Sequence, residues 1–339
     1  MPSETRPMKV LLLFDVARPV APDVAYNAEA FLQEDKTAEA NILASLERLG
    51  HEVVTMAVYD NIPAVVERVK SVAPGVVFNQ CESFYGNRAF EPNIPALLDL
   101  MRIPYTGSQP DGLLLCKDKA LAKQVLSHHH VRVPRFVVSH LKSPLRRLRQ
   151  FGYPAFVKPI AEESSDGIAK ASFVRDEKEA IERLRFLHQK FNSDAMVEQY
   201  IEGRELYVSV LGNRRRVVFP PREIFFEHVP DDEPKFATSH AKWNDAYRKK
   251  WGITNGPAAE LPEAVQKDLR KVARNLCEWL RIRGFGRIDF RLSPSNEMFV
   301  IEANPNPSLA AEDDFAQSAN ADGMTYDALI QEILNAALS

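Results

Sequence analysis

Three side chains that could hold a metal ion, and an arginine beside them, stand close together near the C-terminal end of the sequence. Asp289 lies in a short apolar segment, Glu302 and Asn304 lie in the next one, and Arg287 precedes the aspartate by two residues. Side chains alternate along a strand, so Arg287 and Asp289 are expected on one face, and Glu302 and Asn304 likewise. A turn through residues 293–296 would bring these faces together, and we expect Arg287 to lie near Glu302.

The two carboxylates need a cation, because a pair about 4 Å apart repels by roughly 4 kcal/mol at an effective dielectric constant near 20. Arg287 can supply part of that charge. Two carboxylates and an amide oxygen are also ligands that Mg²⁺ prefers, particularly when substrate phosphates complete its coordination. The alternative is a surface hairpin whose arginine and acids only pair with one another. The Glu-x-Asn-x-Asn-Pro sequence favours the metal site. The apolar residues expected on the core side are Ile288, Phe290, Phe299, Ile301 and Ala303.

Two lysines could hold phosphate groups. Lys119 opens a helical segment, and Lys158 ends an apolar strand directly before a proline. A lysine ammonium is a compact charge suited to phosphate oxygens, although most lysines are simply solvated. Ser164, Ser165 and Gly167 would give a loop whose N–H and hydroxyl groups fold over a phosphate.

The first hundred residues alternate strand and helix patterns, which predicts a parallel sheet with helices on both faces. Phosphate-binding glycines are missing after the first strand, so this Rossmann-like sheet lacks the dinucleotide fingerprint. The expected strands are Lys9–Phe14, Glu52–Val58, Val76–Asn79 and Ile103–Thr106, and the expected helices are 35–49, 62–72 and 95–101.

The middle of the chain predicts a compact α+β unit, and the last third predicts a lid and a strand pair. One helix is expected over 111–127, others near 145–151 and over 176–191, with strands at 136–139, 155–158, 168–174, 195–201 and 205–212. Residues 229–260 form a long polar stretch, and connections of that length are usually lids or binding loops. An amphipathic helix from Leu261, strands at 286–292 and 297–301, and a helix over 325–338 complete the chain.

Composition excludes several classes of protein. The 339 residues are 45% hydrophobic and 26% charged, with 43 Lys and Arg against 46 Asp and Glu, a net charge of −3. That balance argues against a general nucleic-acid or anionic-membrane binder. No apolar run approaches the roughly 20 residues of a membrane span. We therefore expect a soluble cytoplasmic protein without nucleic-acid or membrane partners. Its three cysteines are expected as buried free thiols, namely Cys81, Cys116 and Cys277.

The sequence resembles the ATP-grasp superfamily, and more closely its D-alanine–D-alanine ligase branch. Gly-Phe-Gly-Arg-Ile-Asp-Phe and Ile-Glu-Ala-Asn-Pro-Asn-Pro look like the metal-site segments of that branch. Asp-Lys at 118–119, Val-Lys-Pro at 157–159 and Glu-Gln-Tyr-Ile-Glu-Gly-Arg-Glu at 198–205 match in the expected order. The resemblance implies an N-terminal domain over 1–112, a central ATP-grasp subdomain over 113–202 and a C-terminal subdomain over 203–339.

The resemblance also implies roles for particular residues. Two Mg²⁺ ions, or Mn²⁺ in their place, would be held by Asp289, Glu302 and Asn304. ATP would contact Lys119, Lys158, Ser164, Ser165, Gly167, Glu198, Gln199, Tyr200, Ile201 and Glu205, with Glu198 facing the adenine and Glu205 the ribose. Lys242, Arg287 and the backbone near Ser308 would serve the reacting groups.

The activity implied is ATP-dependent ligation of a small carboxylate to an amine through an acyl phosphate, by an enzyme that resemblance suggests is a homodimer. Glu163, His240 and Trp243 depart from the residues usual in this branch. In the dipeptide ligases that this sequence resembles, a serine near the position of Asp313 and Asp314 holds the acceptor carboxylate, so we expect an acceptor other than D-alanine. Glu82 is a weaker candidate for a donor amino group. The alternatives are a genuine D-alanine–D-alanine ligase and an ATP-binding regulatory module without turnover.

Overall fold

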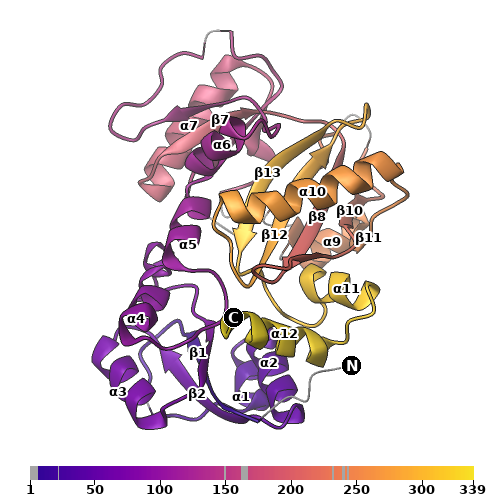
Figure 1. The fold of residues 1–339 in the computed structure, drawn as a ribbon. Coiled ribbons are helices and arrows are strands. Elements are labelled where there is room, and N and C mark those ends of the chain that lie inside the picture. The colour runs from indigo at the N-terminus through magenta and orange to yellow at the C-terminus, as the bar shows by residue number, and fades with distance from the viewer. Residues whose placement is uncertain are drawn as a thin grey trace.

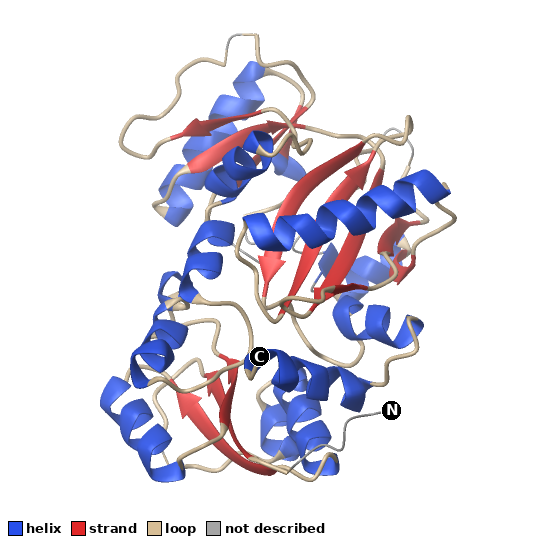
Figure 2. Ribbon diagram, in the orientation of Figure 1, coloured by secondary structure: helices blue, strands red, loops and turns tan. Residues whose placement is uncertain are grey.

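The computed structural model describes residues 7–21, 23–148, 150–161, 167–230, 233–238, 241–242 and 244–339. Within these ranges the strands form three sheets, each accompanied by helices (Figures 1 and 2). The three cysteines are buried free thiols, as predicted. No helix in the described ranges combines the length and apolarity needed to cross a membrane.

The N-terminal sheet is parallel, with strand order β2-β1-β3. Its central strand is apolar on both faces, as befits a strand covered by helices on both sides. The fourth strand expected at 103–106 is only a single bridge between Tyr105 and Val77. The elements are β1 (Lys9–Asp15), α1 (Ala28–Gln33), α2 (Thr37–Arg48), β2 (Glu52–Val58), α3 (Ile62–Val72), β3 (Val76–Gln80), η1 (Arg88–Phe90) and α4 (Asn93–Met101).

The prediction of a single helix over 111–127 is wrong, because the helix is interrupted at Asp118. Helices α5 (Pro110–Lys117) and α6 (Lys119–His128) meet there, and Asp118 has extended backbone. Its carboxylate accepts hydrogen bonds from the N–H groups of Ala120 and Leu121, so it caps α6. The break turns α6 toward the central sheet.

The central sheet is antiparallel, with strand order β4-β7-β5-β6, and α7 packs against it. The helix expected near residues 145–151 is not formed in the described part of that segment. Leu148 and Phe151 instead reach the core beneath α7 from a loop. The elements are β4 (Phe136–Ser139), β5 (Ala155–Pro159), η2 (Lys170–Ser172), β6 (Phe173–Val174), α7 (Glu177–Phe191) and β7 (Ala195–Gln199).

The C-terminal sheet has the order β11-β10-β8-β12-β13, with β9 paired to β8. Helix α10 crosses one face of this sheet, as Figure 1 shows, and its apolar stripe packs there. The polar stretch 229–260 contains both α9 and β11. The elements are β8 (Arg204–Leu211), β9 (Val217–Val218), β10 (Arg222–Phe226), α9 (Asp245–Trp251), β11 (Ile253–Pro257), α10 (Glu263–Trp279), β12 (Phe285–Leu292) and β13 (Met298–Pro305).

The pairing of β12 with β13 differs from the expected register. Asp289, not Arg287, lies opposite Glu302, and a β-bulge follows at Asp289/Phe290. Phe290 then pairs with Val300, which leaves Ile301 as the extra residue. Val300 and Ala303 therefore join the core, whereas the expected core position of Ile301 is wrong.

The last two helices pack against elements from earlier parts of the chain. Helix α11 (Asp314–Ala321) packs against β8, and α12 (Tyr326–Ala337) packs against α2 and β3 of the N-terminal sheet. Figure 1 shows α12 lying beside α2. The core beneath α12 is thus shared by the first and last elements of the chain.

Candidate active site

The two predicted metal carboxylates lie directly opposite each other on β12 and β13. Arg287 donates to both oxygens of Asp289, at 2.8 and 3.0 Å. Lys119 Nζ lies 3.0 Å from Glu302 Oε1. Each carboxylate therefore already has a cationic partner from the protein, and that partner must be exchanged or shared when a metal binds.

The electrostatic environments of the two acids differ. Burial raises the pKa of Asp289 and outweighs the opposing effect of Arg287. Burial also opposes ionisation of Glu302, but Lys119, Lys158 and Lys242 together lower its pKa to about 2. Glu302 is thus a firmly ionised acid in a cationic surrounding.

Oxygen donors at this place fit a hard divalent cation. The side-chain N–H₂ of Asn304 donates to the carbonyl of Arg287 at 3.5 Å, which leaves its amide oxygen as an acceptor. No group of three or more His, Cys, Asp or Glu suited to a metal occurs in the described ranges. Asp289 and Glu302 would supply two carboxylate ligands, and Mg²⁺ usually completes its shell with water and substrate phosphate oxygens.

A second buried charge cluster lies around Glu198 of β7. Lys158 Nζ is 2.7 Å from one carboxylate oxygen and Lys123 Nζ is 3.2 Å from the other. Glu198 is 3% exposed, and although burial opposes ionisation, the two lysines lower its pKa. Sequence reasoning gave Lys123 no role. The signal available was its position four residues after Lys119, on the same face of α6.

The segment expected to hold the nucleoside runs from Gln199 to Glu205. Gln199 is exposed, Tyr200 is half-buried and Ile201 is buried. Glu205 accepts from the hydroxyl of Tyr207 at 2.9 Å and lies 3.2 Å from Arg291. Arg291 also donates to the carbonyls of Gly203 and Lys235, so it joins this segment to the stretch that begins the lid.

The remaining predicted residues are spread around these clusters. Ser308 is exposed in the loop after β13, and Lys242 is half-buried. Gly167 has φ +75° and its carbonyl accepts from Arg183 at 2.6 Å. The other members of the expected phosphate loop and of the lid motif lie outside the described residues: Ser164, Ser165, Glu163, His240 and Trp243.

The two acids at the start of α11 have different surroundings. Asp313 is exposed at the N-cap of the helix and its side chain makes no capping hydrogen bond. Asp314 is 2.7 Å from Arg222 and accepts from Asn255 at 2.7 Å. Sequence reasoning did not identify Arg222 or Asn255, because they come from strands β10 and β11, far from Asp314 along the chain.

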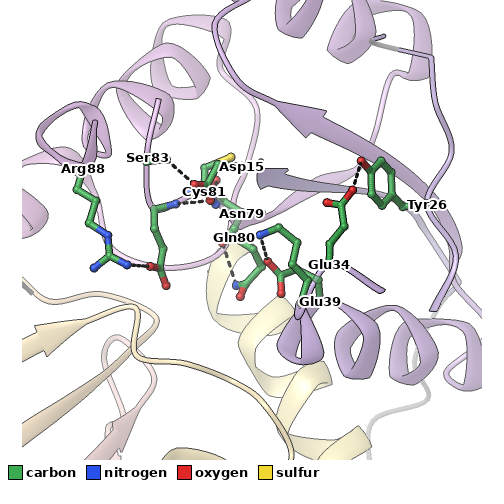
Figure 3. Close-up of polar contacts among 11 residues, drawn as sticks. Asp15, Tyr26, Glu34, Glu39, Asn79, Gln80, Cys81, Ser83 and Arg88 are labelled. Carbon is green, nitrogen blue, oxygen red and sulfur yellow. Dashed lines mark hydrogen bonds and ion pairs between the residues drawn. The ribbon is translucent and has the colours of Figure 1, made fainter. Parts of the chain in front are cut away.

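Glu82 lies just beyond β3. Figure 3 shows its neighbours Cys81 and Ser83 beside Asn79 and Asp15, at the carboxyl ends of the parallel strands. Its carboxylate is 3.2 Å from Arg88, and both groups are exposed. The backbone N–H of Glu82 and the hydroxyl of Ser83 donate to Asp15. Asp15 therefore fixes the backbone from which Glu82 projects.

Comparisons with known proteins agree on one family. Residues 124–335 match the family model described as D-ala D-ala ligase C-terminus. The chain is similar to a D-alanine–D-alanine ligase of Bordetella petrii, with 30% identity over 75% of this chain and 74% of that protein. It is 29% identical to a D-alanine–D-alanine ligase of Moorella thermoacetica, over 88% of this chain and 92% of that protein. Among solved structures, the ATP complex of the Bacillus anthracis D-alanine–D-alanine ligase has a TM-score of 0.74 and 19% identity, over 98% of this chain and 97% of that chain.

Proposed function

This chain belongs to the D-alanine–D-alanine ligase family of ATP-grasp enzymes, and we propose that it joins a small carboxylate to an amine with conversion of ATP to ADP and phosphate. Its mixed α/β fold is that of the family. The observation that carries the proposal is the opposition of Asp289 and Glu302 across β12 and β13, with Lys119 3.0 Å from Glu302. A surface hairpin of mutually paired charges would not bury Asp289 to 6% exposure beside a 5% exposed lysine.

The reaction has two steps. In the first, an oxygen of the donor carboxylate attacks the γ-phosphorus of ATP and the bond to ADP breaks. In the second, the amine attacks the acyl carbonyl, phosphate leaves, and the nitrogen loses a proton. Lys119 and Lys158 would bind phosphate oxygens and neutralise the charge that is transferred. Mg²⁺ held by Asp289, Glu302 and Asn304 would supply further charge neutralisation when bound.

Arg287 is the residue we assign to the second step. Two of its five N–H donors hold Asp289, and the remainder can donate to the oxyanion that forms on the acyl carbon. Burial would lower the pKa of Arg287, but Asp289 overrides this and raises it, so the guanidinium stays charged. Backbone N–H groups near the exposed Ser308 would assist, and Lys242 would contact a substrate carboxylate.

We propose an acceptor other than D-alanine, because Asp313 adds negative charge where the family places a serine. Asp314 contributes less to that argument, since Arg222 and Asn255 both engage its carboxylate. The same contacts favour the second candidate, a genuine D-alanine–D-alanine ligase, because Arg222 offsets the negative charge of Asp314 next to Asp313. An ATP-binding module without turnover is disfavoured by the complete set of lysines and carboxylates. We retain the three-domain division at 1–112, 113–202 and 203–339, the homodimer and the cytoplasmic location as parts of the proposal.

The test is ADP release from ATP and Mg²⁺ by the purified protein, with a panel of acids alone and of acid–amine pairs. We expect release with at least one pair and weak release with D-alanine as both substrates. Asp313→Ser should raise the rate with D-alanine. Efficient D-alanyl-D-alanine formation by the wild type would overturn the acceptor assignment. ATP binding without ADP release across the whole panel would support the regulatory module instead.

A further inference from the structure

Lys123 is a buried lysine whose ammonium contacts two parts of the site at once. It is 2% exposed, and its Nζ lies 3.2 Å from Glu198 of the central sheet. The same Nζ donates to the carbonyl of Ile301 at 2.9 Å and to that of Val300 at 3.4 Å, both on β13 of the C-terminal sheet. Helix α6 thus carries a charge that connects the sheet bearing Glu198 with the strand bearing Glu302.

Lys123 Nζ makes three contacts inside the protein. It donates hydrogen bonds to the carbonyls of Ile301 and Val300, and it forms an ion pair with Glu198 at 3.2 Å. Lys158 differs, because Glu198 is the partner that the described part of the chain gives its Nζ. Lys158 can therefore turn to a phosphate, whereas Lys123 would have to abandon three contacts to do so.

Ile301, which Lys123 contacts on β13, occupies a special position in that strand. Ile301 is the extra residue of the β-bulge and has no partner on β12. A bulge redirects the side chains beside it, and the next side chain here is Glu302, which faces Asp289. By accepting a hydrogen bond from Lys123, the Ile301 carbonyl fixes the bulge and with it the direction of Glu302.

We propose that Lys123 is a positioning residue of the nucleotide site, which holds Glu198 in place on one side and the bulge that directs Glu302 on the other. This inference rests on the proposed ATP-dependent function. When Lys158 turns from Glu198 to a phosphate, Lys123 remains to balance the glutamate, which stays ionised and stationary. Lys119 and Lys158 contact the phosphates, and Lys123 acts through Glu198 and Glu302.

The proposal predicts that loss of Lys123 changes both the KM for ATP and the Mg²⁺ requirement, whereas loss of the Glu198 carboxylate changes the KM for ATP alone. In Lys123→Met we expect the KM for ATP and the Mg²⁺ concentration for half-maximal rate each to rise ~10- to 100-fold, the range for partners that orient metal ligands. Glu198→Gln should raise the KM for ATP and leave the Mg²⁺ requirement within about twofold. In the double variant Lys123→Met/Glu198→Gln, the effects on the KM for ATP should be clearly less than additive. The reason is that each substitution breaks the same ion pair, that of Lys123 with Glu198.

The matched control is Lys117→Met. Lys117 is a buried lysine on the neighbouring helix α5, paired with Glu91 at 3.0 Å, and it lies outside the candidate nucleotide site. We expect this variant to lose stability and to keep both kinetic parameters. Equal kinetic effects of Lys117→Met and Lys123→Met, or parameters within about twofold of wild type in Lys123→Met, would overturn the proposal.

A measurement on the wild-type protein covers the case in which Lys123→Met does not fold. Burial lowers the pKa of Lys123 to about 8, against the opposing effect of Glu198, while Lys158 and Glu302 also face it. ATP affinity should therefore fall as the pH rises through about 8, and Glu198→Gln, which removes a carboxylate that holds the proton on Lys123, should move the fall to lower pH. A flat wild-type profile would refute the role of Lys123. Wild-type protein that binds no MgATP at any pH would instead refute the proposed function.

Discussion

The charged residues of the site are paired with one another before any substrate arrives. Lys119 neutralises Glu302, Arg287 neutralises Asp289, and Lys158 neutralises Glu198. Removing one partner of such a buried pair leaves the other charge uncompensated. The resulting loss in the free energy of unfolding is larger than the amount that the intact pair contributes. The cations and acids of the site therefore protect each other, and single substitutions should affect both function and stability.

Glu302 should make the stability of the metal-free protein depend on acid pH. Its pKa of about 2 lies below its ordinary 4.5, so its stabilising effect is complete above about pH 4.5 and is lost as the pH falls toward 2. The difference corresponds to about 3 kcal/mol. Urea unfolding with a chelator, at pH values between about 5 and 3, should show this loss in the wild type.

The matched comparison uses two glutamates of the same hairpin. Glu302→Gln should remove that part of the slope with pH, whereas Glu297→Gln should keep it, because Glu297 is half-exposed and lies 4.0 Å from Arg132. Identical slopes in the wild type and in Glu302→Gln would contradict the ion pair with Lys119.

Arg287 should affect turnover more than ATP binding. Arg287→Met removes the donor assigned to the oxyanion, so we expect kcat to fall by ~10²- to 10³-fold with a smaller change in the KM for ATP. Arg281→Met is the control, since Arg281 is exposed and pairs with Asp111 at 3.1 Å on the surface. A rise in the KM for ATP with unchanged kcat would assign Arg287 to nucleotide binding instead.

At this scale, sequence spacing sufficed for residues that share an element, but it did not fix the register between adjacent strands. Alternation along β12 put Arg287 and Asp289 on one face, and the structure shows them paired. The contact of Arg222 with Asp314 could not be predicted from the sequence, because it depends on how β10 and α11 are placed relative to each other. The roles of these residues stay predictions.

At the scale of elements, the errors in the sequence-based assignment have local causes. The helical pattern over 111–127 continues through Asp118, but a capping carboxylate favours ending one helix and starting another there. The pattern near 145–151 is helical in composition, yet burial of Leu148 and Phe151 under α7 decides its conformation. The bulge in β13 follows from no residue pattern, and it shifted the expected register.

Asp118 should be important for the junction of α5 and α6. Asp118→Ala removes the acceptor for two backbone N–H groups, so we expect a loss of about 1 kcal/mol in the free energy of unfolding, measured in urea. Asp118→Asn keeps an acceptor oxygen and should lose less. Equal losses in both variants would show that charge, not capping, matters at this position.

At the scale of the whole molecule, the parallel sheet expected near the N-terminus is confirmed, whereas the expected C-terminal strand pair is part of a larger sheet that also takes in β8. Sequence order along the chain predicts the N-terminal sheet because neighbouring elements tend to pack together. It did not predict that α12 would return to the first sheet, since an amphipathic helix does not specify which surface it covers.

Helix α12 should contribute strongly to stability. Ile333 is fully buried in the core that α12 shares with β1 and α2. Ile333→Ala should lower the free energy of unfolding by about 2–5 kcal/mol through lost burial and a cavity. Leu338→Ala, at a position 47% exposed, should change it by less than about 0.5 kcal/mol. Similar losses at both positions would contradict the packing of α12.

The return of α12 has a consequence for biosynthesis. Val10, Leu12 and Phe14 leave the ribosome long before Ile330, Ile333 and Leu334, which complete their core. The N-terminal sheet must wait with one side open until α12 emerges, so a chaperone that shields nascent apolar strands would find its target here.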